Sequence, residues 1–266
     1  MSLAPGAAKE SDLTWFDDSR VADLSRDGQT LLFSEGGVAE GANQAVYVRR
    51  TDGSPAVRMG DGVAQALSPD ERWIVTLRNE RLVLLPTGAG EPKTIPTPGL
   101  EVQGASWFPD GKRILFFAAA RGQRSRVYTA DLVGSAPRPI TPEGFAGWHV
   151  SPDGRFFLAR DDDRSVFLFP VDSSEPRPLR GIASRELLVG FDMAGTGLFL
   201  ASRGLPLKIA RYDIASGRRE LWKEIPVSDP AGVVQFNNIV LTPDGQSYAY
   251  TFVRMLSRLY VVDGLK

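Results

Sequence analysis

The sequence predicts an all-β protein, a six-bladed β-propeller built from four-stranded blades. One phrase recurs six times along the 266 residues: an apolar run, a turn related to Ser-Pro-Asp-Gly, and a second apolar run. The copies are Ser25-Arg26-Asp27-Gly28, Ser68-Pro69-Asp70-Glu71, Phe108-Pro109-Asp110-Gly111, Ser151-Pro152-Asp153-Gly154, Asp192-Met193-Ala194-Gly195 and Thr242-Pro243-Asp244-Gly245. They start 43, 40, 43, 41 and 50 residues apart, and a period of roughly 40–45 residues made of short strands is typical of propeller blades. No segment shows a convincing helical pattern, which agrees with this fold class.

Each copy is expected to form the tight hairpin between the first two strands of a blade. In Thr242-Pro243-Asp244-Gly245, proline presets φ for the first central position of the turn, and glycine takes the position with φ > 0. The hydroxyl before proline can bond a turn amide, and β-branched and aromatic residues flank the turn. The aspartates are therefore interpreted as turn caps rather than as a set of ligands. The fifth copy is degenerate.

The other strands of a blade follow each turn. In blade one they are Leu31-Leu32-Phe33, Ala45-Val46-Tyr47-Val48 and, after a turn, Ala56-Val57-Arg58-Met59. Later outermost strands often carry proline, as in Pro137-Arg138-Pro139-Ile140. Proline suits an outer edge, because one side of that strand needs no ladder hydrogen bonds.

Closure of the ring is expected to involve the N-terminus. The last copy supplies three strands, at residues 239–241, 248–252 and 259–262, and a fourth is missing. Leu13-Thr14-Trp15-Phe16 precedes the first repeat without a partner of its own, so it is expected to complete the sixth blade. Residues 1–12 are expected to be disordered or an added leader, since Met1-Ser2-Leu3 is typical of one. Residues 13–266 are expected to form a single domain.

Composition excludes several classes of function. The chain has 31 basic and 32 acidic residues, so no overall charge attracts nucleic acid or an anionic membrane. No apolar run approaches the ~20 residues of a membrane span. Cysteine is absent, which excludes disulfides, thiolate metal sites and cysteine nucleophiles. The chain is expected to be a monomer that neither binds nucleic acid nor inserts into a membrane.

No catalytic signature is present. His149 is the single histidine, so a multi-histidine metal centre is impossible and a Ser-His-Asp triad would have to use it. It is expected to be packed or hydrogen-bonded in the inner strand of blade four, on the side opposite Trp148. No nucleophile elbow and no phosphate-binding glycine loop occurs. We therefore expect no catalytic residue, no metal site and no cofactor.

Two charged loops lie on one rim of the predicted ring. Asp161-Asp162-Asp163 belongs to blade four, and Arg121-Gly122-Gln123-Arg124-Ser125-Arg126 is the equivalent loop of blade three. Both are expected to be solvated hairpin loops, which could pair with each other or meet a polar partner. A calcium site at the aspartates is the alternative.

A binding site is expected where the inner strands enter the central channel. Polar and aromatic side chains from different blades converge there. The long loop Glu35–Gln44 of blade one is expected on the same face, as is the segment Arg203–Leu207. The candidate residues are Gln65, Gln103, Trp148, Asn237, Asn238 and Arg203. They are expected to bind a protein or a small ligand, although channel amides are often only solvated.

The Pro-Asp repeat resembles that of TolB-type propellers over essentially the whole chain. Longer phrases resemble the C-terminal propeller of bacterial receptor-type serine/threonine protein kinases. They are Ala22-Asp23-Leu24-Ser25-Arg26-Asp27-Gly28-Gln29-Thr30-Leu31-Leu32-Phe33, Arg49-Arg50-Thr51-Asp52-Gly53-Ser54-Pro55-Ala56-Val57-Arg58, Asp229-Pro230-Ala231-Gly232-Val233-Val234 and Leu256-Ser257-Arg258-Leu259-Tyr260-Val261-Val262-Asp263-Gly264-Leu265-Lys266. No kinase motif occurs in the chain, and the matched motifs are structural, so no functional residue of the family carries over.

The resemblance implies a non-catalytic sensor or interaction module of a larger signalling protein, outside the cytoplasmic membrane. A free-standing periplasmic partner-binding protein of the TolB type is one alternative. A calcium-dependent lactonase-type propeller enzyme is another, for which Asp23 and Glu101 are the available channel carboxylates. A propeller that accompanies a peptidase domain and gates its substrate is a third alternative, which requires that this chain be a fragment of a longer protein with a hydrolase domain.

Overall fold

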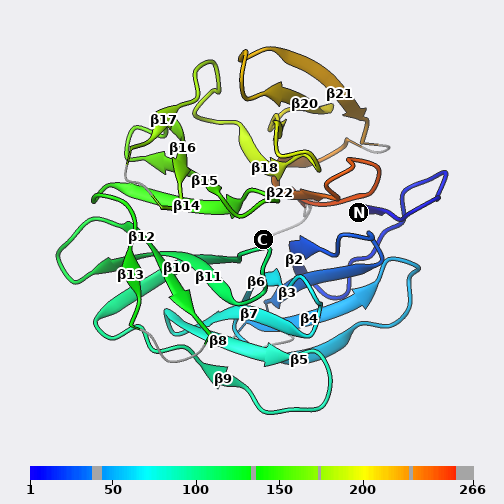
Figure 1. Cartoon of the computed structure of the whole chain (residues 1–266). Coiled ribbons are helices and arrows are strands. Elements are labelled where there is room, and N and C mark those ends of the chain that lie inside the picture. The colour runs from blue at the N-terminus through cyan, green and yellow to red at the C-terminus, as the bar shows by residue number, and fades with distance from the viewer. Residues whose placement is uncertain (38–43, 133–135, 173–174, 228–229, 256–266) are drawn as a thin grey trace, which may run out of the picture.

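The computed structural model describes residues 1–37, 44–132, 136–172, 175–227 and 230–255. Six antiparallel sheets stand around a central channel (Figure 1), which confirms the predicted six-bladed propeller. The described residues contain no helix of the length and hydropathy that a membrane span requires.

The strands follow one another outward from the channel in each blade. Blade one contains β2 (Asp18–Leu24), β3 (Thr30–Gly36), β4 (Ala45–Arg50) and β5 (Val57–Asp61). Blade two contains β6 (Val63–Leu67), β7 (Trp73–Arg78), β8 (Arg81–Pro86) and β9 (Lys93–Thr94). Blade three contains β10 (Leu100–Trp107), β11 (Arg113–Ala120), β12 (Arg126–Asp131) and β13 (Arg138–Pro139). Blade four contains β14 (Phe145–Val150), β15 (Phe156–Asp161), β16 (Val166–Pro170) and β17 (Arg177–Pro178). Blade five contains β18 (Leu187–Phe191), β19 (Gly197–Ala201), β20 (Leu207–Asp213) and β21 (Arg219–Ile225). Blade six contains β22 (Val233–Leu241), β23 (Tyr248–Arg254) and the short N-terminal β1 (Ser2–Leu3).

The repeated turn is held by its own side chains. In blade four the Ser151 hydroxyl donates to Asp153 Oδ1 at 2.6 Å and accepts from the Phe156 amide at 2.9 Å. Asp153 Oδ1 also accepts from the Arg155 amide at 3.0 Å, and the hydrogen bond from Ser151 is the main cause that lowers the pKa of Asp153 to about 2. The same contacts recur at Ser25 and Asp27, Ser68 and Asp70, and Thr242 and Asp244. The interpretation of these aspartates as turn caps is confirmed.

The degenerate fifth copy uses a different cap. Asp192 stands where the other turns have a hydroxyl or phenylalanine, and its Oδ1 accepts from the Thr196 amide at 3.0 Å. Its Oδ2 pairs with Arg211 Nη2 at 2.6 Å. The turn therefore keeps its geometry after the Ser-Pro-Asp sequence has been lost.

Replacement of Ser151 by alanine is expected to lower the free energy of unfolding by about 1 kcal/mol, because the Phe156 amide loses its acceptor. Urea unfolding of the whole chain measures the change. Ser184→Ala serves as the control, since this exposed hydroxyl makes no hydrogen bond within the described residues. Equal midpoints for the two variants would contradict the capping role.

The ring is closed by an N-terminal strand, as predicted, but residues 13–16 are not that strand. Instead β1 pairs antiparallel with β23, with Ser2 opposite Ala249 and Leu3 opposite Tyr248. The strand comes from residues 1–12, the segment expected to be disordered or a leader. The third strand expected at residues 259–262 lies outside the described residues.

Residues 13–16 have a packing role, which explains why they form no strand. The Leu13 side chain is 6% exposed and belongs to a cluster with Val21 and Ala249, at the boundary of blades six and one. The Leu13 carbonyl accepts from Arg49 Nη1 at 2.9 Å, and the Arg49 guanidinium lies 5.5 Å from the ring centre of Trp15. The segment therefore contacts Arg49 of blade one through its backbone and through Trp15, and it forms no β-ladder with blade six.

The hydrophobic core lies between neighbouring blades. Val75 and Leu82 of blade two pack in one buried cluster with Ile114 and Phe116 of blade three. Similar clusters join the other blades, as where Leu158 of blade four meets its neighbours in blade five. These layers fix the distance of each inner strand from the channel axis, and so they position the candidate site.

Candidate functional site

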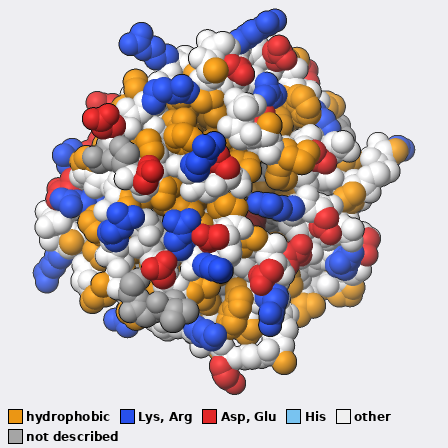
Figure 2. Space-filling view, in the orientation of Figure 1, with side chains coloured by type: hydrophobic (Ala, Val, Ile, Leu, Met, Phe, Trp, Pro, Cys, Tyr) orange, Lys and Arg blue, Asp and Glu red, His pale blue; other side chains and the backbone are white. Residues whose placement is uncertain are grey.

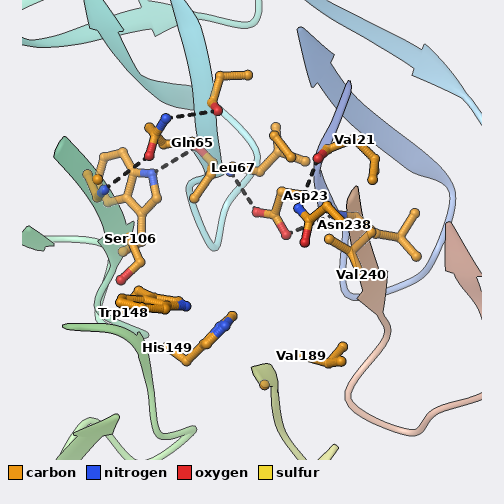
Figure 3. A pocket seen from close by; sticks show the side chains of 18 of the residues that line it. Val21, Asp23, Gln65, Leu67, Ser106, Trp148, His149, Val189, Asn238 and Val240 are labelled. Carbon is orange, nitrogen blue, oxygen red and sulfur yellow. Dashed lines mark hydrogen bonds between the residues drawn. The ribbon is translucent and has the colours of Figure 1, made fainter. Parts of the chain in front are cut away.

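The inner strands of all six blades surround a channel of about 1130 Å³ (Figure 3). Each inner strand has a β-bulge, which places one extra residue opposite its partner strand. The bulge residues are Ala22, Gln65, Gln103, His149, Val189 and Asn237. All six line the channel. The bulges therefore turn a ring of three amides, one imidazole and two small apolar groups toward the central space.

Five of the six predicted binding residues line this channel. They are Gln65, Gln103, Trp148, Asn237 and Asn238. Arg203 does not line it, because its guanidinium turns to the rim. There Nε donates to the Arg185 carbonyl at 3.1 Å and Nη1 donates to the Phe236 carbonyl at 3.3 Å.

Two of the channel amides connect neighbouring blades. Gln65 Oε1 accepts from the Ala105 amide of blade three at 3.2 Å, and its Nε2 donates to the Ala64 carbonyl at 3.1 Å. Asn238 Nδ2 donates to the Val21 carbonyl of blade one at 3.0 Å. Figure 3 shows the Asn238 contact beside that of Asp23. Gln65 therefore links blade two to blade three, and Asn238 links blade six to blade one.

Two further amides keep hydrogen-bonding capacity. Gln103 Oε1 accepts from the Ser125 hydroxyl at 3.0 Å, and Asn237 Oδ1 accepts from Gln235 Nε2 at 2.9 Å. In the part of the chain that the structure describes, neither Gln103 Nε2 nor Asn237 Nδ2 has an acceptor. Both NH₂ groups can therefore donate to a ligand.

Trp148 gives the channel an aromatic wall. Its ring lies 5.6 Å from that of Phe117, tilted by 36°. The Phe117 ring in turn covers Gly104, where a Cβ atom would collide with it. Glycine at this position thus lets the two rings pack beside the channel, where they present a flat apolar surface next to the amides.

Asp23 is a half-buried carboxylate of the channel, whose lining also includes Glu71. Its Oδ1 accepts from the Leu24 amide and its Oδ2 from the Leu67 amide of blade two, both at 2.8 Å. Burial raises the pKa of Asp23 to about 6, and the negative charge of Glu71 adds to the shift. Glu101, the other carboxylate considered for calcium, is exposed and does not line the channel. The two carboxylates therefore do not converge.

His149 lies beside Trp148 in the channel wall (Figure 3). The expectation that strand alternation separates the two residues is wrong, because the bulge at His149 interrupts the alternation. Its φ is 60°, a left-handed conformation that is uncommon outside glycine. The expected hydrogen bond is confirmed: Nε2 lies 2.9 Å from the Leu188 carbonyl of blade five. A carbonyl only accepts, so Nε2 carries the proton and Nδ1 is left as an acceptor. Burial lowers the pKa of His149 to about 4.

The rim loops pair with each other, one of the two outcomes expected for them. Asp162 Oδ2 lies 2.7 Å from Arg124 Nη1, and Asp161 Oδ1 accepts from the Ser165 amide at 2.8 Å. The described residues hold no group of three or more His, Asp or Glu side chains that could bind a metal ion. On the face seen in Figure 2, basic and acidic side chains are interspersed rather than gathered by sign.

Comparison with solved structures identifies the type of propeller. TolB from Acinetobacter baumannii superposes with a TM-score of 0.63 at 19% identity, over 85% of this chain and 64% of TolB. The chain has a TolB-like propeller fold. The putative TolB from Agrobacterium tumefaciens gives the same TM-score at 18% identity, over 89% of this chain and 90% of that one. An oligogalacturonate lyase in complex with manganese superposes with a TM-score of 0.60 at 15% identity, over 84% of this chain and 68% of the lyase.

At these identities the likeness extends to the fold alone, and the neighbours include both a binding protein and an enzyme. No family model matches the chain. No curated protein matches it in sequence. A decision between binding and catalysis must therefore come from the channel itself.

Proposed function

We propose that this chain is a non-catalytic binding propeller, whose channel takes up a segment of a partner protein or a small ligand. The observation that carries the proposal is the pair of uncharged donors, Gln103 Nε2 and Asn237 Nδ2, left unused beside the aromatic wall of Trp148. Neutral donors with a flat apolar surface suit recognition of polar uncharged groups.

The channel chemistry favours binding over catalysis. Both oxygens of Asp23 accept backbone hydrogen bonds, and the His149 imidazole is fixed by the Leu188 carbonyl. A calcium-dependent lactonase-type enzyme would need a set of converging acidic ligands. Glu101 lies away from the channel, and Asp23 and Glu71, which line it, belong to no group of three or more His, Asp or Glu side chains among the described residues. Addition of calcium is therefore expected to give neither saturable heat in calorimetry nor a thermal shift. A stoichiometric calcium site in the channel would overturn this part of the proposal.

The cellular setting is proposed from the sequence resemblance. The phrases shared with receptor-type kinases support a module of a larger bacterial signalling protein, on the outer side of the cytoplasmic membrane. Immunoblotting of fractionated source cells tests this setting. A membrane-bound band far larger than 29 kDa supports the receptor module. A soluble band near that mass overturns it and favours the TolB-like periplasmic alternative.

Binding at the channel is tested by comparative capture from an envelope extract. Immobilised wild-type chain, the Gln103→Ala/Asn237→Ala variant and an Arg155→Gln control are compared. Arg155 is an exposed residue of a repeat turn, away from the channel lining. The proposal expects a partner that the wild type and the control retain and that the double variant loses by about tenfold. Indifference of every captured protein to the double variant contradicts a binding role for these amides.

A further inference from the structure

Three arginines converge on one short connection between blades four and five. This connection, residues 184–186, leads into the inner strand β18. Arg160 Nη1 and Nη2 donate to the Ser184 and Glu186 carbonyls, both at 2.7 Å. Arg164 Nε donates to the Ser184 carbonyl at 3.4 Å, and Arg203 Nε donates to the Arg185 carbonyl at 3.1 Å. Arg160 and Arg164 share the Ser184 carbonyl, and Arg203 binds the carbonyl of the next residue, so the three guanidinium groups gather at one short segment.

Arg160 forms the fixed base of this group. It is 6% exposed, and its hydrogen bonds go to backbone carbonyls, including that of Arg164 at 3.3 Å. Burial is the main cause that lowers its pKa, and the positive charges of Arg164 and Arg203 act in the same direction. Arg160 therefore contributes a buried positive charge that no described carboxylate pairs with.

The nearby acidic groups are largely committed elsewhere. Both carboxylate oxygens of Glu186 receive hydrogen bonds from Arg219, at 2.9 and 2.7 Å. Asp162 pairs with Arg124, and Asp161 accepts from the Ser165 amide. Asp163 is exposed beside Arg164. Within the described residues, four arginines of this region form no ion pair, whereas only two of its carboxylates, those of Asp161 and Asp163, form none. The four arginines are Arg160, Arg164, Arg185 and Arg203.

Arg164 and Arg203 keep donors for a ligand. Both side chains are exposed. Arg164 is anchored through Nε, and Arg203 through Nε and Nη1. Arg203 Nη2 and both Nη atoms of Arg164 have no acceptor in the described part of the chain. The free edge of Arg164, formed by its two Nη atoms, matches a tetrahedral or carboxylate oxyanion, and Nη2 of Arg203 adds a further donor.

We propose that Arg164 and Arg203 form a binding site for an oxyanion group, a phosphate or a sulfate, at the rim between blades four and five. Arg160 supplies the buried charge beneath this rim site, and residues 184–186 hold the three guanidinium groups in place. The site is separate from the channel, since none of these residues lines it. It gives the propeller a second point of recognition, suited to a partner that carries a phosphorylated or sulfated group.

Sodium phosphate at pH 7.5 is the probe, titrated against sodium chloride at constant ionic strength. The readout is the set of arginine Nε–Hε and backbone amide resonances. Saturable shifts are expected at Arg164, Arg203 and residues 184–186, and the Arg164→Gln/Arg203→Gln variant is expected to bind about tenfold more weakly or not at all. A parallel titration with sulfate distinguishes the two ligands. Sulfate binding as tight as phosphate binding supports a general oxyanion site, and weaker sulfate binding indicates that the site prefers phosphate.

Two controls keep the result decisive. Arg155→Gln removes an exposed arginine at a repeat turn and is expected to bind phosphate as the wild type does. Arg164→Lys keeps the charge but loses the planar edge, and it is expected to bind more weakly than the wild type while remaining folded. Absence of a saturable response in the wild type, or unchanged binding by the double variant, overturns the proposal. Gln103→Ala/Asn237→Ala should leave phosphate binding intact, so failure at the channel and failure at the rim site are distinguishable.

Discussion

Removal of residues 1–18 is expected to lower the melting temperature by at least about 10 °C or to abolish cooperative folding. The deletion removes the strand Ser2–Leu3 from the edge of β23 and empties the space filled by Leu13 between blades six and one. It also removes Glu10, whose carboxylate oxygens accept from the Tyr248 and Tyr250 hydroxyls at 2.7 and 2.9 Å. Together these losses amount to more than about 4 kcal/mol, which corresponds to at least 10 °C for a domain of this size.

Smaller changes distinguish the contribution of strand β1 to stability from that of the packing of Leu13. Deletion of residues 1–3 removes β1 alone, whereas Leu13→Ala leaves β1 in place and is expected to cost about 2–5 kcal/mol through the cavity it creates. Val57→Ala is the matched control, because Val57 is 58% exposed on an outer strand. Thermal unfolding by circular dichroism measures all four proteins. A melting temperature that stays unchanged after the 1–18 deletion would show that the ring closes without the N-terminus.

The repeated turns could be predicted because their geometry is local. A hydroxyl, a proline, an aspartate and a glycine within four positions suffice to cap the turn, and six such signals at a regular spacing define the ring. The closing strand is different, since residues 13–16 have the composition of a strand. In the structure they contact residues distant in sequence: the Leu13 carbonyl accepts from Arg49, and the Leu13 side chain packs in a cluster with Ala249. The true closing strand, Ser2–Leu3, is too short to produce any periodic signal.

The positions of the channel residues could be predicted from the topology of a propeller, but their roles could not. Inner strands line the channel of any propeller, so Gln65, Gln103 and Asn238 could be placed there from the repeat alone. Whether an amide holds two blades together, as Gln65 does, or keeps a free donor, as Gln103 does, depends on the neighbouring blade. Arg203 lies at the rim of the channel face. Its guanidinium donates to the carbonyls of residues 185 and 236 and does not line the channel.

The β-bulges of the inner strands are the main feature of the site that the periodicity of the sequence does not predict. A strict two-residue alternation places Trp148 and His149 on opposite sides of β14, yet the extra residue in the strand brings both to the channel. The same irregularity occurs in all six inner strands. No residue type marks it, because the bulge residue is alanine, valine, histidine or an amide. The geometry of the site thus depends on a backbone feature that is shared by the blades and invisible in the motif.

Replacement of His149 by asparagine is expected to make the free energy of unfolding fall, relative to the wild type, as the pH rises from 4 to 6. In the wild type, the pKa of His149 falls from 6.5 to about 4 on folding, because burial disfavours the imidazolium. The unfolded chain therefore binds a proton in this window that the folded chain does not. The free energy of unfolding falls as the pH is lowered from 6.5 to 4, by about 3 kcal/mol. Asparagine is chosen because it tolerates the left-handed φ at this position.

Asp23 acts in the opposite direction over nearly the same window. Its pKa rises from 3.8 to about 6 on folding, so the folded state retains a proton that the unfolded chain has released. This stabilisation is present below pH 3.8 and is lost as the pH rises through 6, by about 3 kcal/mol. The two contributions to the pH dependence of the free energy of unfolding nearly cancel in the wild type. Each can be measured when the other group is removed.

Urea unfolding at half-unit steps from pH 4 to 7 measures both effects. Relative to the wild type, His149→Asn should lose stability as the pH rises from 4 to 6, and Asp23→Asn should gain stability over the same range. The turn aspartates, such as Asp153 with its lowered pKa, titrate below this window and cancel in the differences between variants. Parallel curves for the wild type and both single variants would show that neither group changes its protonation on folding. The double variant, which lacks both groups, should again run parallel to the wild type, because opposite slopes of similar size have been removed together.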